Sequence, residues 1–138
     1  MVKVIGPQVI CSNFIEKDGK FLIFMCPRFK VWRVPGGRTE FNEKLEETVV
    51  REMEEEAGVI VKNPVFLGYG QDHQFHVRDK RETSRLLMFF HVKINEEVTV
   101  DADEAEEFKW VEFEEIKNIE NKEGGLTDFF SKNPDKKL

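Results

Sequence analysis

The sequence predicts an α/β protein in which short strands surround one amphipathic helix. Three observations support this class. Apolar runs of strand length both precede and follow residues 43–57. That central segment instead has apolar residues at helical spacing, since Leu45, Val49, Met53 and Ala57 recur every four positions. The 138 residues suit one domain, residues 1–138, with an ordinary hydrophobic core.

The segments before the helix are predicted to form strands joined by tight turns. Residues 8–14 alternate loosely between apolar and polar side chains, as in a strand with one buried face. Residues 16–19 should form a hairpin turn, because Asp-Gly is a strong turn signal. Residues 21–25 are continuously apolar and predict a buried strand. Residues 31–34 predict a short strand, which the Pro-Gly-Gly at residues 35–37 should end.

The central helix should end at Gly58, and the segments after it predict more strands and two short helical pieces. We expect strand segments at residues 60–61 and 65–69, with residues 74–77 as a candidate continuation, followed by a charged turn at 79–82. A strand at 86–94, an acidic loop at 95–106 and an edge strand at 108–113 should come next. The chain should then form a helical turn at 114–119, a short helix at 126–130 and a frayed tail at 131–138. The strand at 86–94 is the best defined, because it is rich in apolar and aromatic residues.

Composition argues against several partners and locations. The formal net charge of −6 disfavours a nucleic-acid polymer as partner, since such a partner demands a basic face, but it does not exclude a phosphate-containing ligand. The sequence has no apolar run near 18 residues and no signal-peptide pattern, so we expect no membrane partner. Cys11 and Cys26 lie in strand-like runs without a CxxC pattern and are expected to be buried free thiols. Together these features predict a cytoplasmic protein.

Three glutamates near the end of the central helix need a physical explanation. Glu52, Glu55 and Glu56 are spaced i, i+3 and i+4, so they lie within about 100° of one another on the helix surface. They repel one another, and they sit where the helix dipole is already negative. On a helical wheel Glu56 lies between Leu45 and Val49, on the side expected to face the core. A solvated acidic face is the plain alternative, whereas a bound Mg²⁺ or Mn²⁺ would explain the clustering, because these ions prefer oxygen ligands.

The residues around these glutamates match a known motif. Gly37 is followed after five residues by Glu43, after seven more by Arg51-Glu52-Met53, and then by Glu55-Glu56 and Gly58-Val59. This pattern resembles the Nudix box, GX5EX7REUXEEXGU with U a bulky aliphatic residue, at every fixed position. The resemblance implies a Nudix-type α/β/α sandwich, with a mixed β-sheet between helices and the box forming a loop–helix–loop on one side.

The resemblance also implies an activity and a cofactor. Nudix proteins typically hydrolyse a nucleoside diphosphate linked to another group, with water attacking a phosphorus atom. Carried over by position, Glu52 and Glu56 are the firmest ligands of Mg²⁺ or Mn²⁺ and Glu55 is the third, while Gly36 would offer a backbone carbonyl to the ion. The other box residues are expected to be structural: Gly37, Glu43, Arg51 and Gly58.

A further carboxylate is expected from the acidic run at residues 101–107, because family members often recruit one from a distant loop. Glu104 is the candidate for this fourth catalytic carboxylate, with a solvated acidic loop as the alternative. The general base could be Glu52, Glu55 or Glu104, and the sequence leaves the choice open.

Basic residues surround the entrance to the box. Arg33 and Arg38 are candidates to hold phosphate oxygens, as are Arg28 and Lys30, with ordinary surface charge as the alternative. The three histidines are possible metal ligands by residue type. However, His73 and His76 are three positions apart on a predicted strand and should point to opposite faces, so we expect the histidines to be structural or exposed: His73, His76 and His91.

The sequence thus predicts a metal-dependent pyrophosphohydrolase that acts on a small-molecule nucleotide. The competing hypothesis is a Nudix-fold sensor or regulator that binds a nucleotide without turning it over. Such proteins usually lose acids of the box, and this chain retains all of them. Nucleoside triphosphates, nucleotide sugars such as ADP-ribose or GDP-mannose, and dinucleoside polyphosphates all stay open as substrates. A homodimer would be compatible with the family.

Overall fold

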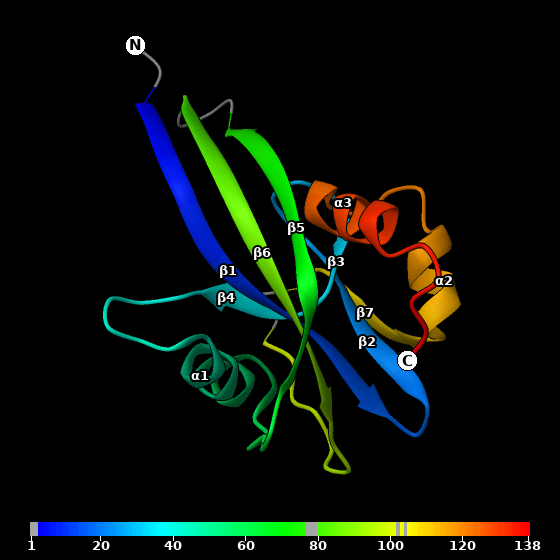
Figure 1. Ribbon diagram of the computed structural model, residues 1–138. Coiled ribbons are helices and arrows are strands. Elements are labelled where there is room, and N and C mark those ends of the chain that lie inside the picture. Colours follow the sequence, from blue (N-terminus) through cyan, green and yellow to red (C-terminus); the bar gives the residue numbers. More distant parts are fainter. Residues whose placement is uncertain (1–2, 77–79, 102, 104) are drawn as a thin grey trace.

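The computed structural model describes residues 3–76, 80–101, 103 and 105–138. It contains one mixed seven-stranded sheet with a helix on one face and two helices on the other (Figure 1). The elements in chain order are β1 (Lys3–Lys17), β2 (Lys20–Met25), β3 (Trp32–Arg33), β4 (Gly36–Arg38), α1 (Leu45–Ala57), β5 (Val65–His76), β6 (Arg81–Lys93), β7 (Phe108–Val111), α2 (Phe113–Asn118) and α3 (Gly124–Lys132). This architecture confirms the predicted α/β/α sandwich.

The sheet is built on the pairing of β1 with β6. These two strands are parallel, and every other strand pair is antiparallel. The main strand order is β3-β2-β1-β6-β5, while β4 also pairs with β1 and β7 also pairs with β2. Because β1 has partners on both sides, its central residues are completely buried, and β4 is held directly against it.

Two hydrophobic clusters, one on each face, fix the helices to the sheet. On the first face, Cys11 and Ile15 of β1 pack in one cluster with Val49, Met53 and Ala57 of α1. The second cluster takes the alternate residues of β1 and is rich in phenylalanine. The Phe14 ring lies within 6.4 Å, centroid to centroid, of five other rings: Phe21, Phe89, Phe113, Phe129 and Phe130.

Helix α1 begins and ends at identifiable signals. Its first residue is Leu45, two positions later than predicted, because Glu43 is held by Arg51 and Lys44 takes the N-cap position. The Lys44 backbone N–H donates to the Glu47 carboxylate at 2.9 Å. The helix ends at Gly58, which has φ 69° and donates its N–H to the Glu54 carbonyl at 3.1 Å, while the Val59 N–H donates to the Met53 carbonyl at 3.4 Å. The predicted glycine stop is therefore confirmed.

Several element boundaries differ from the sequence predictions, and strand pairing explains most of the differences. Residues 35–37 were expected to end the strand before them, and β3 does end at Arg33, but Gly36–Arg38 then pairs with β1 as a separate short strand. Residues 60–61 are not in a strand, whereas residues 65–76 form one continuous strand beside β6. Residues 77 and 79, part of a predicted strand and turn, lie outside the described residues.

The chain after β7 is more helical than predicted. Phe113 was expected to end a strand, but it begins α2, where it packs into the phenylalanine-rich cluster. Helix α3 starts at Gly124 and continues to Lys132, into the predicted tail, because Phe129 and Phe130 anchor it to the sheet. Within the described residues, no helix is both long and apolar enough to cross a membrane.

Candidate active site

The three glutamates of the box differ in their burial. Glu56 is only 6% exposed, so the helical-wheel prediction that it faces the core is confirmed. The Glu52 side chain is 13% exposed and the Glu55 side chain is 59% exposed. Burying glutamate carboxylates costs free energy unless each one is paired with a donor or a cation. The inner side of the helix end is therefore an environment that favours positive charge.

Two glycines bring the box strand close to these carboxylates. Gly37 lies directly under Glu52, since a Cβ atom added at Gly37 would be 2.2 Å from the Glu52 carboxylate carbon. A Cβ added at Gly36 would be 2.0 Å from the backbone carbonyl oxygen of Cys11 in β1. The backbone of β4 is therefore sandwiched between β1 and the Glu52 side chain, at a distance that only glycine allows.

Arg51 connects the box helix to the loop that precedes it. Its guanidinium donates to both oxygens of Glu43, at 2.7 and 3.0 Å, and to the backbone carbonyl of Arg38 at 3.0 Å. It also donates to Glu52 at 2.8 Å and to Glu55 at 3.3 Å. The hydrogen bond from Arg51, with a second from Thr48, lowers the pKa of Glu43 to about 2, and the same pairing raises the pKa of Arg51. This guanidinium thus contacts two of the three glutamates that were proposed to bind a cation, and it shares its single positive charge with Glu43 as well.

The donor set fits a hard divalent cation in its chemistry. It offers carboxylate oxygens at Glu52, Glu55 and Glu56, and the Gly37 backbone lies directly beneath the Glu52 carboxylate. In the conformation described, no three His, Cys, Asp or Glu side chains of residues 3–76, 80–101, 103 and 105–138 converge as a metal site. Arg51 holds Glu52 and Glu55 in place of such an ion.

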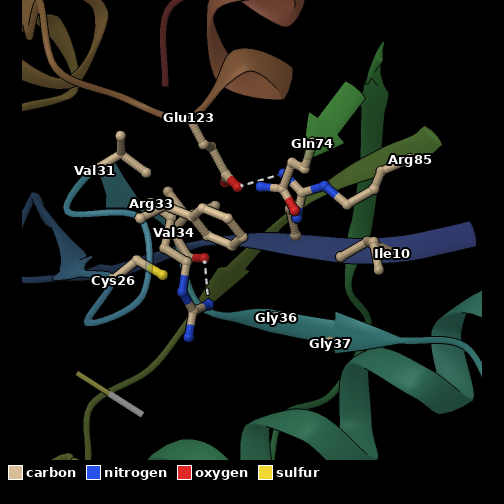
Figure 2. A pocket seen from close by; sticks show the side chains of 12 residues that line it. Ile10, Cys26, Val31, Arg33, Val34, Gly36, Gly37, Gln74, Arg85 and Glu123 are labelled. Atoms are coloured by element: carbon tan, nitrogen blue, oxygen red, sulfur yellow. Dashed lines mark hydrogen bonds and ion pairs between the residues drawn. The ribbon is translucent and has the colours of Figure 1, made fainter. Parts of the chain in front are cut away.

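A hollow of about 190 Å³ opens beside Gly36 and Gly37, on the side of β4 away from α1 (Figure 2). Gly36 and Gly37 line one wall, and Glu123, Gln74 and Arg85 converge on the opposite wall. It adjoins a second hollow lined by four arginines, which we call the arginine-lined hollow: Arg28, Arg38, Arg81 and Arg85. Arg85 is already paired with Asp72 and Glu123. Arg28 and Arg38 add positive charge beside the box, and in a chain with a net charge of −6 this makes the surface there attractive to anions.

A nearly buried ion network forms the far wall of the first hollow. Arg85 donates to both oxygens of Asp72, at 2.7 and 2.5 Å, and to Glu123 at 3.0 Å. The Gly125 N–H at the start of α3 donates to Asp72 at 2.9 Å. Burial raises the pKa of Glu123, and the charge of Arg85 opposes this shift. The network rigidly connects β5, β6 and α3, and so fixes the shape of the hollow.

Sequence reasoning did not find Gln74, Arg85 or Glu123 as residues near the box. Arg85 and Glu123 are 38 positions apart, and neither belongs to a recognisable motif. The one available signal was the position of Arg85 directly before the apolar run at residues 86–94, because a charged side chain next to a buried segment usually needs a partner.

The basic residues predicted to hold phosphate oxygens differ in whether they line a hollow or are paired with another residue. Arg38 lines the arginine-lined hollow, as does Arg28. Arg33 lines the first hollow, where its guanidinium donates to the Val34 carbonyl at 3.2 Å and lies over the Phe24 ring. Lys30 forms an ion pair with Glu106.

The remaining sequence predictions concern Glu104, the histidines and the cysteines. Glu104 lies outside the described residues. The side chain of His76 is also outside the described part of the chain. His73 is exposed, 3.8 Å from Glu82, and His91 pairs with Glu16 at 2.7 Å. Both cysteines are free thiols, as predicted, and Cys11 is buried. The prediction of burial is wrong for Cys26, which is half-buried because it lines the first hollow.

Comparison with known proteins identifies the family. The model of the NUDIX domain matches residues 5–130. The uncharacterized Nudix hydrolase YvcI of Bacillus subtilis is 28% identical over 129 residues, covering 91% of this chain and 80% of YvcI. The ADP-ribose pyrophosphatase of Methanocaldococcus jannaschii is 37% identical over 107 residues, covering 74% of this chain but only 62% of that protein.

Solved structures agree with the fold. The MutT protein of Methanosarcina mazei superposes with a TM-score of 0.73 at 21% identity, covering 98% of each chain. The mutator MutT protein of Bacillus halodurans gives a TM-score of 0.69 at 27% identity, covering 91% of this chain and 80% of that one. The match of the family model over most of the chain, together with the complete box, shows that this chain belongs to the Nudix family of hydrolases.

Proposed function

We propose that this Nudix hydrolase uses Mg²⁺ or Mn²⁺ to cleave the pyrophosphate bond of a nucleoside diphosphate linked to another group. Water would form a new O–P bond as the P–O bond of the anhydride breaks, giving a nucleoside monophosphate and a second phosphorylated product. The observation that carries the proposal is the buried carboxylate of Glu56 beside Glu52 on the same helix. The Glu52 carboxylate in turn lies directly over the backbone of Gly37.

The residues proposed to hold the cation are Glu52, Glu55 and Glu56, with the backbone carbonyl of Gly36. When bound, such an ion neutralises the charge of the pyrophosphate and lowers the pKa of a coordinated water. Glu52 and Glu55 would exchange their hydrogen bonds with Arg51 for contacts to the ion, while Arg51 keeps its two bonds to Glu43. Either Glu52, Glu55 or Glu104 would accept the proton from the attacking water.

The substrate is proposed to extend from the cation beside Gly36 and Gly37 into the two hollows, the first of which these glycines line. Arg38 and Arg28 would contact phosphate oxygens, because guanidinium groups match their geometry and carry a permanent charge. Arg33 is a weaker candidate, because its guanidinium already contacts Val34 and Phe24. The rest of the nucleotide would lie in the first hollow, against Gln74 and the wall formed by Arg85 and Glu123.

ADP-ribose is the first substrate to test, because the relative with 37% identity is named for that activity. The panel should also include nucleoside triphosphates, GDP-mannose and a dinucleoside polyphosphate, each with Mg²⁺ and with Mn²⁺. Product identity then assigns the bond that is cut.

The decisive variant is Glu56→Gln, with Glu54→Gln as its matched control. Glu54 is an exposed neighbour on the same helix and is not a fixed residue of the box. We expect Glu56→Gln to lose at least 10³-fold in kcat/KM, about 4 kcal/mol of transition-state stabilisation, while Glu54→Gln keeps the wild-type value. A fully active Glu56→Gln enzyme would refute the assignment of the metal ligands.

A further inference from the structure

The side chain of Asn13 is a buried amide that the fold leaves unsatisfied. Asn13 is 0% exposed. Neither its Oδ1 nor its Nδ2 has a hydrogen-bond partner among the described residues. Buried amides in native proteins are almost always hydrogen-bonded, because leaving water without a new partner is unfavourable. An amide kept in this state at the centre of a sheet therefore points to a partner that the polypeptide does not supply.

The alternation of β1 places this amide on the face that carries the box helix. Cys11 and Ile15, two positions to either side, pack in the cluster that contains Val49 and Met53 of α1. Phe14, the next residue, packs instead with the phenylalanines on the opposite face. Since successive side chains of a strand point to opposite faces, Asn13 shares the face of Cys11 and Ile15.

The backbone pairing places Asn13 next to the glycines of the box. The Asn13 N–H donates to the carbonyl of Pro35 at 2.7 Å. One position earlier, Ser12 pairs with Gly36, and Cys11 pairs with Gly37, which lies under the Glu52 carboxylate. Asn13 is therefore adjacent to the box strand on the α1 side of the sheet.

We infer that Asn13 is a positioning residue for the divalent cation, with its amide oxygen accepting a hydrogen bond from a water molecule that the ion carries. This inference rests on the proposed function. Mg²⁺ keeps several of its waters when it binds protein, and those waters need acceptors around the site. Groups that orient metal-bound water or ligands typically change metal affinity 10- to 100-fold when they are removed. A structural amide satisfied by water without an ion is the competing explanation.

The two explanations predict opposite signs for the same variant, Asn13→Leu, which replaces the amide with an apolar group of similar size. If the amide serves the ion, removing it should raise the melting temperature of the metal-free protein by about 4 °C, because an unsatisfied polar group is gone. Mn²⁺ affinity, measured by titration of the free protein with the metal alone, should fall at least tenfold. If the amide is structural, Asn13→Leu should melt lower than wild type and bind Mn²⁺ normally, which would overturn the inference.

A second variant and a matched control complete the test. Asn13→Asp keeps an oxygen acceptor and adds charge, so it should lower the melting temperature without metal and recover stability on addition of Mn²⁺. Failure to recover would count against the inference. The control is Asn133→Leu, which removes a partly buried amide that donates to the Phe129 carbonyl at 2.9 Å, on the opposite face of the sheet. It should destabilise the protein and leave Mn²⁺ affinity unchanged.

Glu56→Gln separates this inference from the proposed function. If Glu56→Gln weakens Mn²⁺ binding and Asn13→Leu does not, the metal site stands and the role of Asn13 is refuted. If neither variant changes Mn²⁺ binding, the proposed metal site itself is refuted, and the inference that depends on it fails as well.

Discussion

Replacing Gly36 and Gly37 one at a time by alanine should separate effects on catalysis from effects on stability. In Gly37→Ala the new Cβ would lie 2.2 Å from the Glu52 carboxylate carbon, whereas ordinary contact begins at 3.4 Å, so the carboxylate must move by about 1.2 Å. The obstacle is the far end of a flexible side chain, and the fold can accommodate it. A displacement of about 1 Å at a reacting site costs on the order of 10²-fold in rate, or about 2.7 kcal/mol.

Gly36→Ala meets a different obstacle. Its Cβ would lie 2.0 Å from the carbonyl oxygen of Cys11, which belongs to the backbone of a central strand. Backbone in the middle of a sheet cannot move aside without breaking its pairing. We expect a loss of about 3 kcal/mol in the free energy of unfolding, which lowers the melting temperature by about 12 °C in a domain of this size.

The assay measures kcat/KM on the best substrate of the panel and the melting temperature of each variant in a chelating buffer. Gly37→Ala should lose about 10²-fold in kcat/KM and melt within about 2 °C of wild type. The reasoning would be wrong if Gly37→Ala stayed within threefold of the wild-type rate, or if it were destabilised as much as Gly36→Ala.

Three further perturbations test the network, the core and the acid sensitivity of the fold. The pKa of Glu43 is lowered from 4.5 to about 2, so its pairing with Arg51 stabilises the protein above pH 4.5, and this stabilisation is lost as the pH falls toward 2. The difference in melting temperature between wild type and Glu43→Gln should therefore shrink between pH 4.5 and 2. A constant difference would contradict the pairing. Arg85→Met removes the cation between Asp72 and Glu123 and should cost about 3–5 kcal/mol near pH 7 in urea unfolding. Because burial raises the pKa of Glu123, protonation of that carboxyl should relieve part of the cost as the pH falls, whereas a pH-independent loss would indicate lost packing instead. Phe129→Ala should cost about 3–5 kcal/mol in the same assay yet leave Mn²⁺ affinity unchanged, because Phe129 packs on the face opposite α1; a changed affinity would show that the two faces are coupled.

The sequence could predict those features that depend on local spacing. The end of α1 followed from Gly58, whose left-handed backbone is a local requirement. The burial of Glu56 followed from its place on the helical wheel. The order of strands in the sheet was not predictable in this way, and neither was the pairing of Gly36–Arg38 with β1, because both depend on contacts between distant segments.

The wall of the first hollow that faces Gly36 and Gly37 could not be predicted from the sequence for the same reason. Arg85 and Glu123 carry no periodic or motif signal, and only the docking of α3 against β5 and β6 brings them together. The unsatisfied amide of Asn13 was equally invisible, since an asparagine in a strand-like run gives no sign of whether it will find a partner.

The parallel pairing of β1 with β6 has a consequence for how the enzyme matures. Cys11 pairs with Met88, so the central ladder joins residues that lie far apart in the chain, and the whole box is synthesised between them. Contacts of such long range form slowly, because loop closure must precede them. A nascent chain that has not yet released residue 93 from the ribosome lacks the strand that completes the platform under α1. Stalled chains ending before β6 should therefore capture no Mn²⁺, and competence for catalysis should arise only late in biosynthesis.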